Sequence, residues 1–231
     1  MSQLKRTTLL FTFLVGLGCA PKIQQVQFQS KTKELFSSEV VDHPMDTLVG
    51  PYRESLNQEM NAPVGTANCT MSKSRPESAL GNFAADLLQE YAERYFKDSL
   101  PNIKIITLLN NGGLRAPINE GQILLRNVYE LMPFDNVIVF VKVRSEKYAE
   151  MMAYLEDRGG EPIAGFRKDD PEIESDFWIA TSDYLAAGGD KMTFFKDPLM
   201  VIDTGRFLRD EIKAHIENSG EVCTKTDGRW H

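Results

Sequence analysis

The chain has 231 residues, enough for one domain or two small ones, and its 42% hydrophobic and 26% charged residues are typical of a globular rather than a disordered protein. A formal net charge of −7 argues against a nucleic-acid-binding protein that works through a broad basic face. Three histidines and three cysteines leave few side chains for a transition-metal centre.

The N-terminal segment has the pattern of an export signal. Basic residues precede an apolar core at 9–17, which is shorter than the roughly 20 apolar residues of a bilayer-spanning helix. Residues 1–19 resemble a bacterial lipoprotein signal in which Cys19 becomes the lipid-carrying first residue, although Gly16 stands where that signal prefers leucine. An ordinary cleaved signal peptide is the alternative. We therefore expect a protein of the bacterial cell envelope, anchored by a lipid at the periplasmic or outer-membrane face.

The segment that follows the signal has the composition of a tether. Residues 20–40 are polar and lack a sustained period, so the folded domain is expected over residues 41–231. Once Cys19 carries a lipid, Cys69 and Cys223 remain as an even pair near the two ends of that domain. In an oxidising compartment such a pair predicts a disulfide, the alternative being two unpaired buried thiols.

The hydrophobic spacing predicts helices and strands that alternate irregularly. The segment 74–77, SRPE, has the form of a capping box, so a helix is expected to begin there. The run 103–109, IKIITLL, has the length and β-branching of a buried strand. These features predict a single domain of mixed α/β or α+β class. The other expected elements are helices at 45–60, 148–157 and 204–217, an extended stretch at 64–71, and strands at 137–143 and 177–181.

Four short segments stand out, in a fixed order along the chain. They read SALGNFAAD at 78–86, NNGGLR at 110–115, MPFDN at 132–136 and ATSDYLAAGGD at 180–190. Together they resemble the C-terminal, substrate-binding domain of the 5′-nucleotidase family, whose segments read approximately LGN-(L/F)-x-x-D, N-G-G-G-(I/L)-R, P-F-(G/D)-N and (D/N)-(Y/F)-L-A-x-G-G-D. The resemblance runs from residue 45 to about residue 229, with Asn111 in place of one glycine as a minor departure.

The resemblance implies a four-layer α/β/β/α sandwich with a nucleoside pocket. It gives Phe134 and Tyr184 the role of stacking on opposite faces of a base. Physical chemistry agrees, because two flat rings can sandwich a base at about 1–3 kcal/mol per stacked base. The alternative for Phe134 is ordinary core packing.

The resemblance also implies polar contacts to the ligand. It places the ribose at Asp190, whose carboxylate could accept hydrogen bonds from both ribose hydroxyls after two glycines that let the backbone approach. A lone aspartate after two glycines would otherwise be a turn residue. Arg115, Asn110 and Asn136 match further ligand contacts in the family, with capping of their own loops as the alternative.

Two further residues match the family less closely. Arg75 stands just before the first motif helix, where the family often keeps an arginine directed at a phosphate, and a solvated surface arginine is the alternative. Gly165 fits the family's middle loop near the base.

No catalytic residue and no metal ligand is assigned to this chain. Complete 5′-nucleotidases have a metallophosphatase domain with two metal ions, carried by segments such as D-x-H and G-N-H-(E/D), and the chain has none of these. His43, His215 and His231 are scattered along the sequence, and no G-x-S-x-G or Walker-type segment is present. We therefore expect no cofactor in this chain, and divalent metals only in a partner metallophosphatase.

Three functions are consistent with these features. The favoured one is the nucleotide-recognising substrate domain of a split 5′-nucleotidase, which binds a nucleoside or nucleoside 5′-phosphate while a separate metallophosphatase chain completes phosphomonoester hydrolysis. The second is a non-catalytic nucleoside- or nucleotide-binding envelope lipoprotein. The third is an envelope interaction protein that has kept the fold but lost the ligand. None of the three involves a nucleic acid polymer.

Overall fold

Residues 43–100 and 103–230 are described by the structure, a computed structural model. The signal predicted at 1–19, with its lipid-attachment candidate Cys19, and the tether predicted at 20–40 lie outside these residues. The described helices are α1 (His43–Met60), α2 (Ala79–Phe96), α3 (Leu125–Leu131), α4 (Lys147–Asp157), α5 (Asp183–Ala186) and α6 (Leu208–Ser219). The described strands are β1 (Pro63–Ala67), β2 (Ile105–Leu108), β3 (Gly121–Leu124), β4 (Val137–Val143), β5 (Ile163–Ala164), β6 (Phe177–Ser182), β7 (Met200–Phe207) and β8 (Glu221–Val222).

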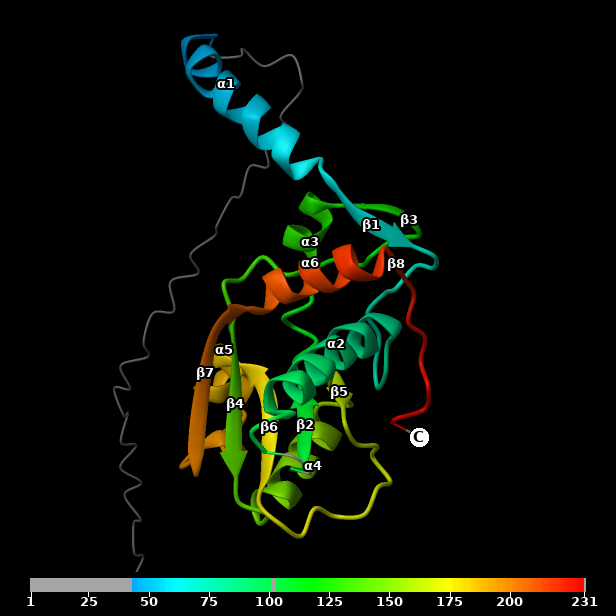
Figure 1. Cartoon of the computed structure of the whole chain (residues 1–231), viewed down its shortest axis with the longest axis vertical. Coiled ribbons are helices and arrows are strands. Elements are labelled where there is room, and N and C mark those ends of the chain that lie inside the picture. The colour runs from blue at the N-terminus through cyan, green and yellow to red at the C-terminus, as the bar shows by residue number, and fades with distance from the viewer. Residues whose placement is uncertain (1–42, 101–102, 231) are drawn as a thin grey trace, which may run out of the picture. The chain divides into compact units, whose positions relative to one another are not determined.

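The larger sheet has the strand order β5-β2-β6-β4-β7. Strands β2 and β6 are buried at every position, so their sequences are mostly apolar without alternation. They run parallel to each other, whereas β4 runs antiparallel to β6. The C-terminal ends of β2 and β6 therefore lie at the same end of the sheet as the N-terminal end of β4. Helix α5 packs beside β4 (Figure 1), and residues of α5 and of the loops at 110–115 and 132–136 come together at this end.

The smaller sheet has the order β3-β1-β8. Ala67 of β1 lies opposite Gly121 in the antiparallel pair with β3 and opposite Val222 in the parallel pair with β8. Cys69 and Cys223 follow β1 and β8 and are joined by a disulfide, with Cα atoms 5.4 Å apart. The disulfide links the start of the domain to its C-terminal segment.

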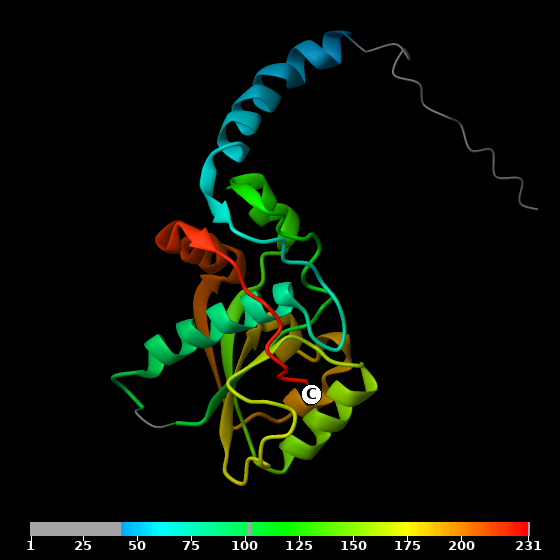
Figure 2. The same ribbon diagram turned by 90° about the vertical axis from the view of Figure 1, so that its right-hand side faces the viewer.

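Helices cover both faces of the larger sheet (Figure 2). On one face α4 and α5 contribute Met151, Leu155 and Leu185 to a buried cluster. On the other face α2 and α6 fill a second cluster, which also contains residues of the smaller sheet. The predicted mixed α+β class with two sheets is confirmed. Helix α2 packs on β2 and β5 of the larger sheet, and α6 packs on β1 of the smaller sheet and on α2.

Two predicted element boundaries are wrong. Helix α2 is capped by Ser78, whose hydroxyl accepts a hydrogen bond from Gly81 N at 2.9 Å, and not by the predicted box at 74–77. The helix predicted at 204–217 begins only at Leu208, because the residues before it pair with β4 as the end of β7. At residues 204–207, pairing with β4 determines the backbone conformation, although the spacing of the apolar residues is that of a helix.

Helix α1 carries an exposed apolar stripe. Met45, Leu48, Tyr52 and Leu56 recur at intervals of three or four residues, and each side chain is more than half exposed. Across the two described ranges, no helix combines the length and the apolarity needed to cross a membrane.

Candidate functional site

A pocket of about 340 Å³ lies where the motif loops meet at the end of the larger sheet. Six of its eight lining residues are ligand contacts predicted from the sequence, and the other two are the glycines of the NNGG loop. Its lining residues are Asn110, Gly112, Gly113, Arg115, Phe134, Asn136, Tyr184 and Asp190. Residues more than seventy positions apart in the sequence lie together here because the ends of β2 and β6 and the start of β4 share one end of the sheet.

Two aromatic side chains form apolar walls of this pocket. Phe134 is 42% exposed and Tyr184 is 49% exposed, so neither ring is part of a hydrophobic core. Asp183 links the segments that carry the two rings, because its Oδ1 accepts hydrogen bonds from Val137 N at 3.1 Å and Tyr184 N at 2.8 Å. In the described part of the chain no ring–ring contact joins Phe134 to Tyr184.

Asp190 is the polar centre of the pocket. Its Oδ2 accepts a hydrogen bond from Asn110 Nδ2 at 2.6 Å, and its Oδ1 accepts one from the Tyr184 hydroxyl at 2.9 Å. Its backbone carbonyl accepts a bond from the Tyr154 hydroxyl at 3.0 Å. Burial raises the pKa of Tyr154, so this donor stays protonated at neutral pH. Each carboxylate oxygen has a second lone pair, so Asp190 can also accept hydrogen bonds from a ligand.

Two glycines are required by the side chains beside them. A Cβ on Gly189 would lie 2.5 Å from Tyr184 Cε1, and a Cβ on Gly113 would lie 2.8 Å from Asn110 Oδ1. Asp190 itself adopts φ 51° and ψ 21°, a left-handed conformation uncommon for a residue with a side chain. The glycine-rich motifs therefore serve to place Tyr184, Asn110 and Asp190.

Arg115 is the cation among the lining residues. Its backbone N–H donates to Leu131 O at 2.8 Å, and its exposed guanidinium makes a long hydrogen bond of 3.3 Å to Gly112 O. The remaining donors of the guanidinium could contact a hydroxyl or phosphate oxygen.

The structure does not bring Arg75 to this pocket. Its guanidinium donates to the carbonyls of Arg158 and Gly160 and forms a 2.9 Å ion pair with Glu161, whose side chain is completely buried. A buried carboxylate needs a positive or hydrogen-bonding partner, and Arg75 supplies one. The structure therefore places Arg75, which was expected to face a ligand phosphate, outside the lining of this pocket.

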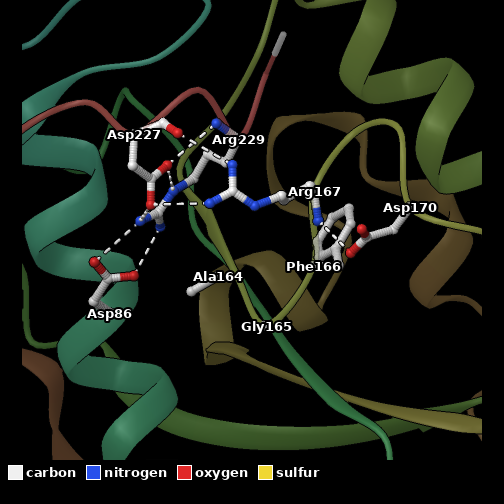
Figure 3. Close-up of a pocket in the computed structure, with 8 residues that line it drawn as sticks. All are labelled: Asp86, Ala164, Gly165, Phe166, Arg167, Asp170, Asp227 and Arg229. Atoms are coloured by element: carbon white, nitrogen blue, oxygen red, sulfur yellow. Dashed lines mark hydrogen bonds and ion pairs between the residues drawn. The ribbon is translucent and has the colours of Figure 1, made fainter.

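Gly165 lines a different pocket, of about 310 Å³ (Figure 3). With φ +80° and a Cβ position 2.8 Å from Ile105 O, it is glycine for backbone reasons and is not near the aromatic walls. Gly165, which was expected near the base, is thus not among the residues that line the pocket of Phe134 and Tyr184. In this second pocket Arg229 forms ion pairs with Asp86 at 2.7 Å and Asp227 at 2.9 Å. Its hydrogen bonds with Arg229 lower the pKa of Asp227, and the network fastens the C-terminal segment to α2.

Several supporting residues were not found from the sequence. Lys73 Nζ donates to the carbonyls of Asn111 and Leu114 at 3.1 and 2.9 Å, and Glu161 Oε2 accepts from Asn111 N at 2.6 Å. These contacts brace the loop that carries Asn110 and Arg115. Since the partners lie 38 to 50 positions apart, no local pattern marks them.

The chain is a mixed α+β domain with a pocket at one end of its larger sheet. The model of the 5′-nucleotidase C-terminal domain matches residues 60–162, so this part of the chain is similar to that family. The trifunctional nucleotide phosphoesterase protein YfkN of Bacillus subtilis is 24% identical over 214 residues, covering 77% of this chain and 14% of that protein. Protein UshA of Escherichia coli is 22% identical over 210 residues, covering 81% of this chain and 37% of that protein.

Solved structures show the same fold. A 5′-nucleotidase precursor from Thermus thermophilus superposes with a TM-score of 0.64 at 20% identity, covering 82% of this chain and 43% of that one. The NAD nucleotidase of Haemophilus influenzae gives a TM-score of 0.56 at 16% identity, covering 82% of this chain and 41% of that one. The chain therefore spans less than half the length of each of these relatives.

The described residues do not fit a di-metal centre of the kind that complete 5′-nucleotidases carry. Within 43–100 and 103–230, no three His, Cys, Asp or Glu side chains are grouped so that they could hold a metal ion. We assign no catalytic step to the side chains of this domain.

Proposed function

We propose that the pocket binds a nucleoside or a nucleoside 5′-phosphate. The observation that carries this proposal is the convergence of Phe134, Tyr184 and Asp190 on one pocket. A base would stack between the two rings, for about 1–3 kcal/mol per ring. The ribose hydroxyls would donate to the Asp190 carboxylate, which Asn110 and the Tyr184 hydroxyl already hold in place. Asn136 would lie at the edge of the base, and Arg115 would contact ribose or phosphate oxygens.

The domain would act as the nucleotide-recognising part of a split 5′-nucleotidase in nucleotide catabolism. A separate metallophosphatase chain would supply divalent metals and complete the hydrolysis of the phosphomonoester. The match of residues 60–162 to the family model and the lack of grouped metal ligands in the described residues support this role. The alternative outcome is a non-catalytic nucleoside- or nucleotide-binding envelope lipoprotein.

Replacing Phe134 with alanine should weaken the binding of adenosine and AMP roughly tenfold or more, because one stacking face is lost. Isothermal titration measures this loss. Tyr52→Ala is the matched control, since Tyr52 is a 75% exposed aromatic residue on α1 that does not line the pocket. Equal affinities of the wild-type and Phe134→Ala chains would refute base stacking on this ring.

Mixing this chain with a metallophosphatase chain from the same organism should produce hydrolysis of AMP in the presence of Mn²⁺. Release of phosphate is the readout, with each chain assayed alone as the control. Nucleotide binding without any gain of hydrolysis would support the non-catalytic alternative. Robust metal-dependent hydrolysis by the pure chain would contradict the split enzyme.

We also propose that the protein is held at the bacterial envelope by a lipid on Cys19, which lies outside the described residues. Labelled palmitate should be incorporated into the wild-type chain and not into Cys19→Ser. A secreted, unlabelled wild-type chain would instead indicate an ordinary signal peptide.

A further inference from the structure

The loop at 132–136, which carries the Phe134 wall, is held from the start of helix α6. The pairing of Val137 with Phe207 brings the first turn of α6 beside this loop. Leu208 N, the first backbone donor of the helix, bonds Asn136 O at 2.9 Å. Met132 anchors the start of the loop in the hydrophobic core, but Phe134 is 42% exposed, so core packing does not fix the place of its ring.

Arg209, the next residue of α6, binds three groups of the same loop. Its Nη1 donates to the carbonyls of Met132 and Phe134, each at 3.3 Å. Its Nη2 pairs with Asp135 Oδ1 at 2.5 Å. Together with the bond from Leu208, these contacts involve Met132, Phe134, Asp135 and Asn136, which are four of the five residues of the loop.

The guanidinium of Arg209 is itself held in one orientation. Its side chain is only 10% exposed, and its carbon Cζ lies 4.3 Å from the centroid of the Tyr129 ring. Its Nε is buried without a hydrogen-bond partner, so the loop contacts of Nη1 and Nη2 are what satisfy this buried cation. A planar guanidinium that is fixed against a ring can bind two carbonyls and a carboxylate at defined positions, whereas the ammonium group of a lysine cannot.

Apart from Asp183, which bonds both Val137 N and Tyr184 N, each wall of the pocket has its own support. Tyr184 is bonded to Asp190, whereas Phe134 depends on the start of α6. We propose that Arg209 is a positioning residue that sets the place of the Phe134 ring for stacking on a base. This inference rests on the proposed function, because its consequence for binding requires a stacked ligand.

The test uses Arg209→Met in the full chain, with Arg206→Met as the matched control. Arg206 has a 55% exposed side chain and pairs with Glu211 at 3.4 Å without contacting the loop. Arg209→Met should lower the affinity for adenosine about tenfold and should raise hydrogen exchange at 132–136, whereas Arg206→Met should change neither. Arg209→Lys should bind adenosine at most somewhat more tightly than Arg209→Met, since it keeps the charge but loses the planar guanidinium.

A double-mutant cycle separates positioning from a general structural effect. In the Phe134→Ala background, adding Arg209→Met should cause no further loss of affinity, because the ring to be positioned is gone. Full additivity in this cycle, or unchanged affinity and exchange in Arg209→Met, overturns the proposal. If Arg209→Met does not fold, Arg209→Lys decides in the same two assays. If the wild-type chain binds no adenosine, the proposed function fails, while exchange at 132–136 still decides whether Arg209 holds the loop.

Discussion

Replacing Asp190 with alanine should weaken the binding of adenosine by about a hundredfold, the largest loss expected for any single residue of the pocket. Hydrogen bonds to a charged group contribute about 1.5–3 kcal/mol each, and the carboxylate is positioned to accept from the ribose hydroxyls. The same change releases Asn110 and the Tyr184 hydroxyl from their shared acceptor. Isothermal titration at neutral pH measures the affinity.

Two further variants make this result specific. Asp190→Asn keeps the volume but removes the charge and turns one of the two acceptors into a donor, so it should bind nearly as weakly as Asp190→Ala. Asp169→Ala removes an exposed carboxylate that does not line the pocket and should bind like the wild type. A threefold or smaller loss in Asp190→Ala would show that ribose does not bind at this carboxylate.

Removal of the disulfide should lower the free energy of unfolding by about 2–5 kcal/mol, because Cys69 and Cys223 are 154 positions apart and their bond restricts a long loop of the unfolded chain. Urea unfolding of the Cys69→Ser/Cys223→Ser variant measures the difference. Reducing agent should destabilise the wild type by a similar amount and leave the double variant unchanged.

The disulfide should matter for stability and little for binding. Neither cysteine lines the pocket, so the double variant should bind adenosine within about twofold of the wild type under folding conditions. A stability loss below about 1 kcal/mol would mean that the ion pair of Arg229 with Asp86 and the hydrogen bond from Asp227 N to Glu77 hold the C-terminal segment without help from the disulfide.

The parts of the fold that the sequence predicted best are those in which local pattern and burial agree. The strand expected at 137–143 is β4 at the same bounds, because an apolar β-branched run is buried between the neighbouring strands β6 and β7. The short elements β3 and α3 were not predicted, since their few residues give no clear period. Strand β7 was in part mistaken for helix, because only its pairing with β4 distinguishes the two.

The composition of the pocket was predicted better than its construction. The family resemblance placed Phe134, Tyr184 and Asp190 together, and the direction of β2, β4 and β6 explains why their loops meet. The contacts of Arg75 and Arg209 depend on partners 74 to 86 positions away, so no sequence pattern could assign them.

The most direct test of a base lying between Phe134 and Tyr184 is an NMR measurement of nuclear Overhauser effects from bound adenosine. The adenine H2 and H8 protons should show effects to the ring protons of both Phe134 and Tyr184, with upfield shifts caused by stacking. Adenine contacts confined to residues outside this pocket, or no change in the spectrum at saturating adenosine, would contradict the proposed site.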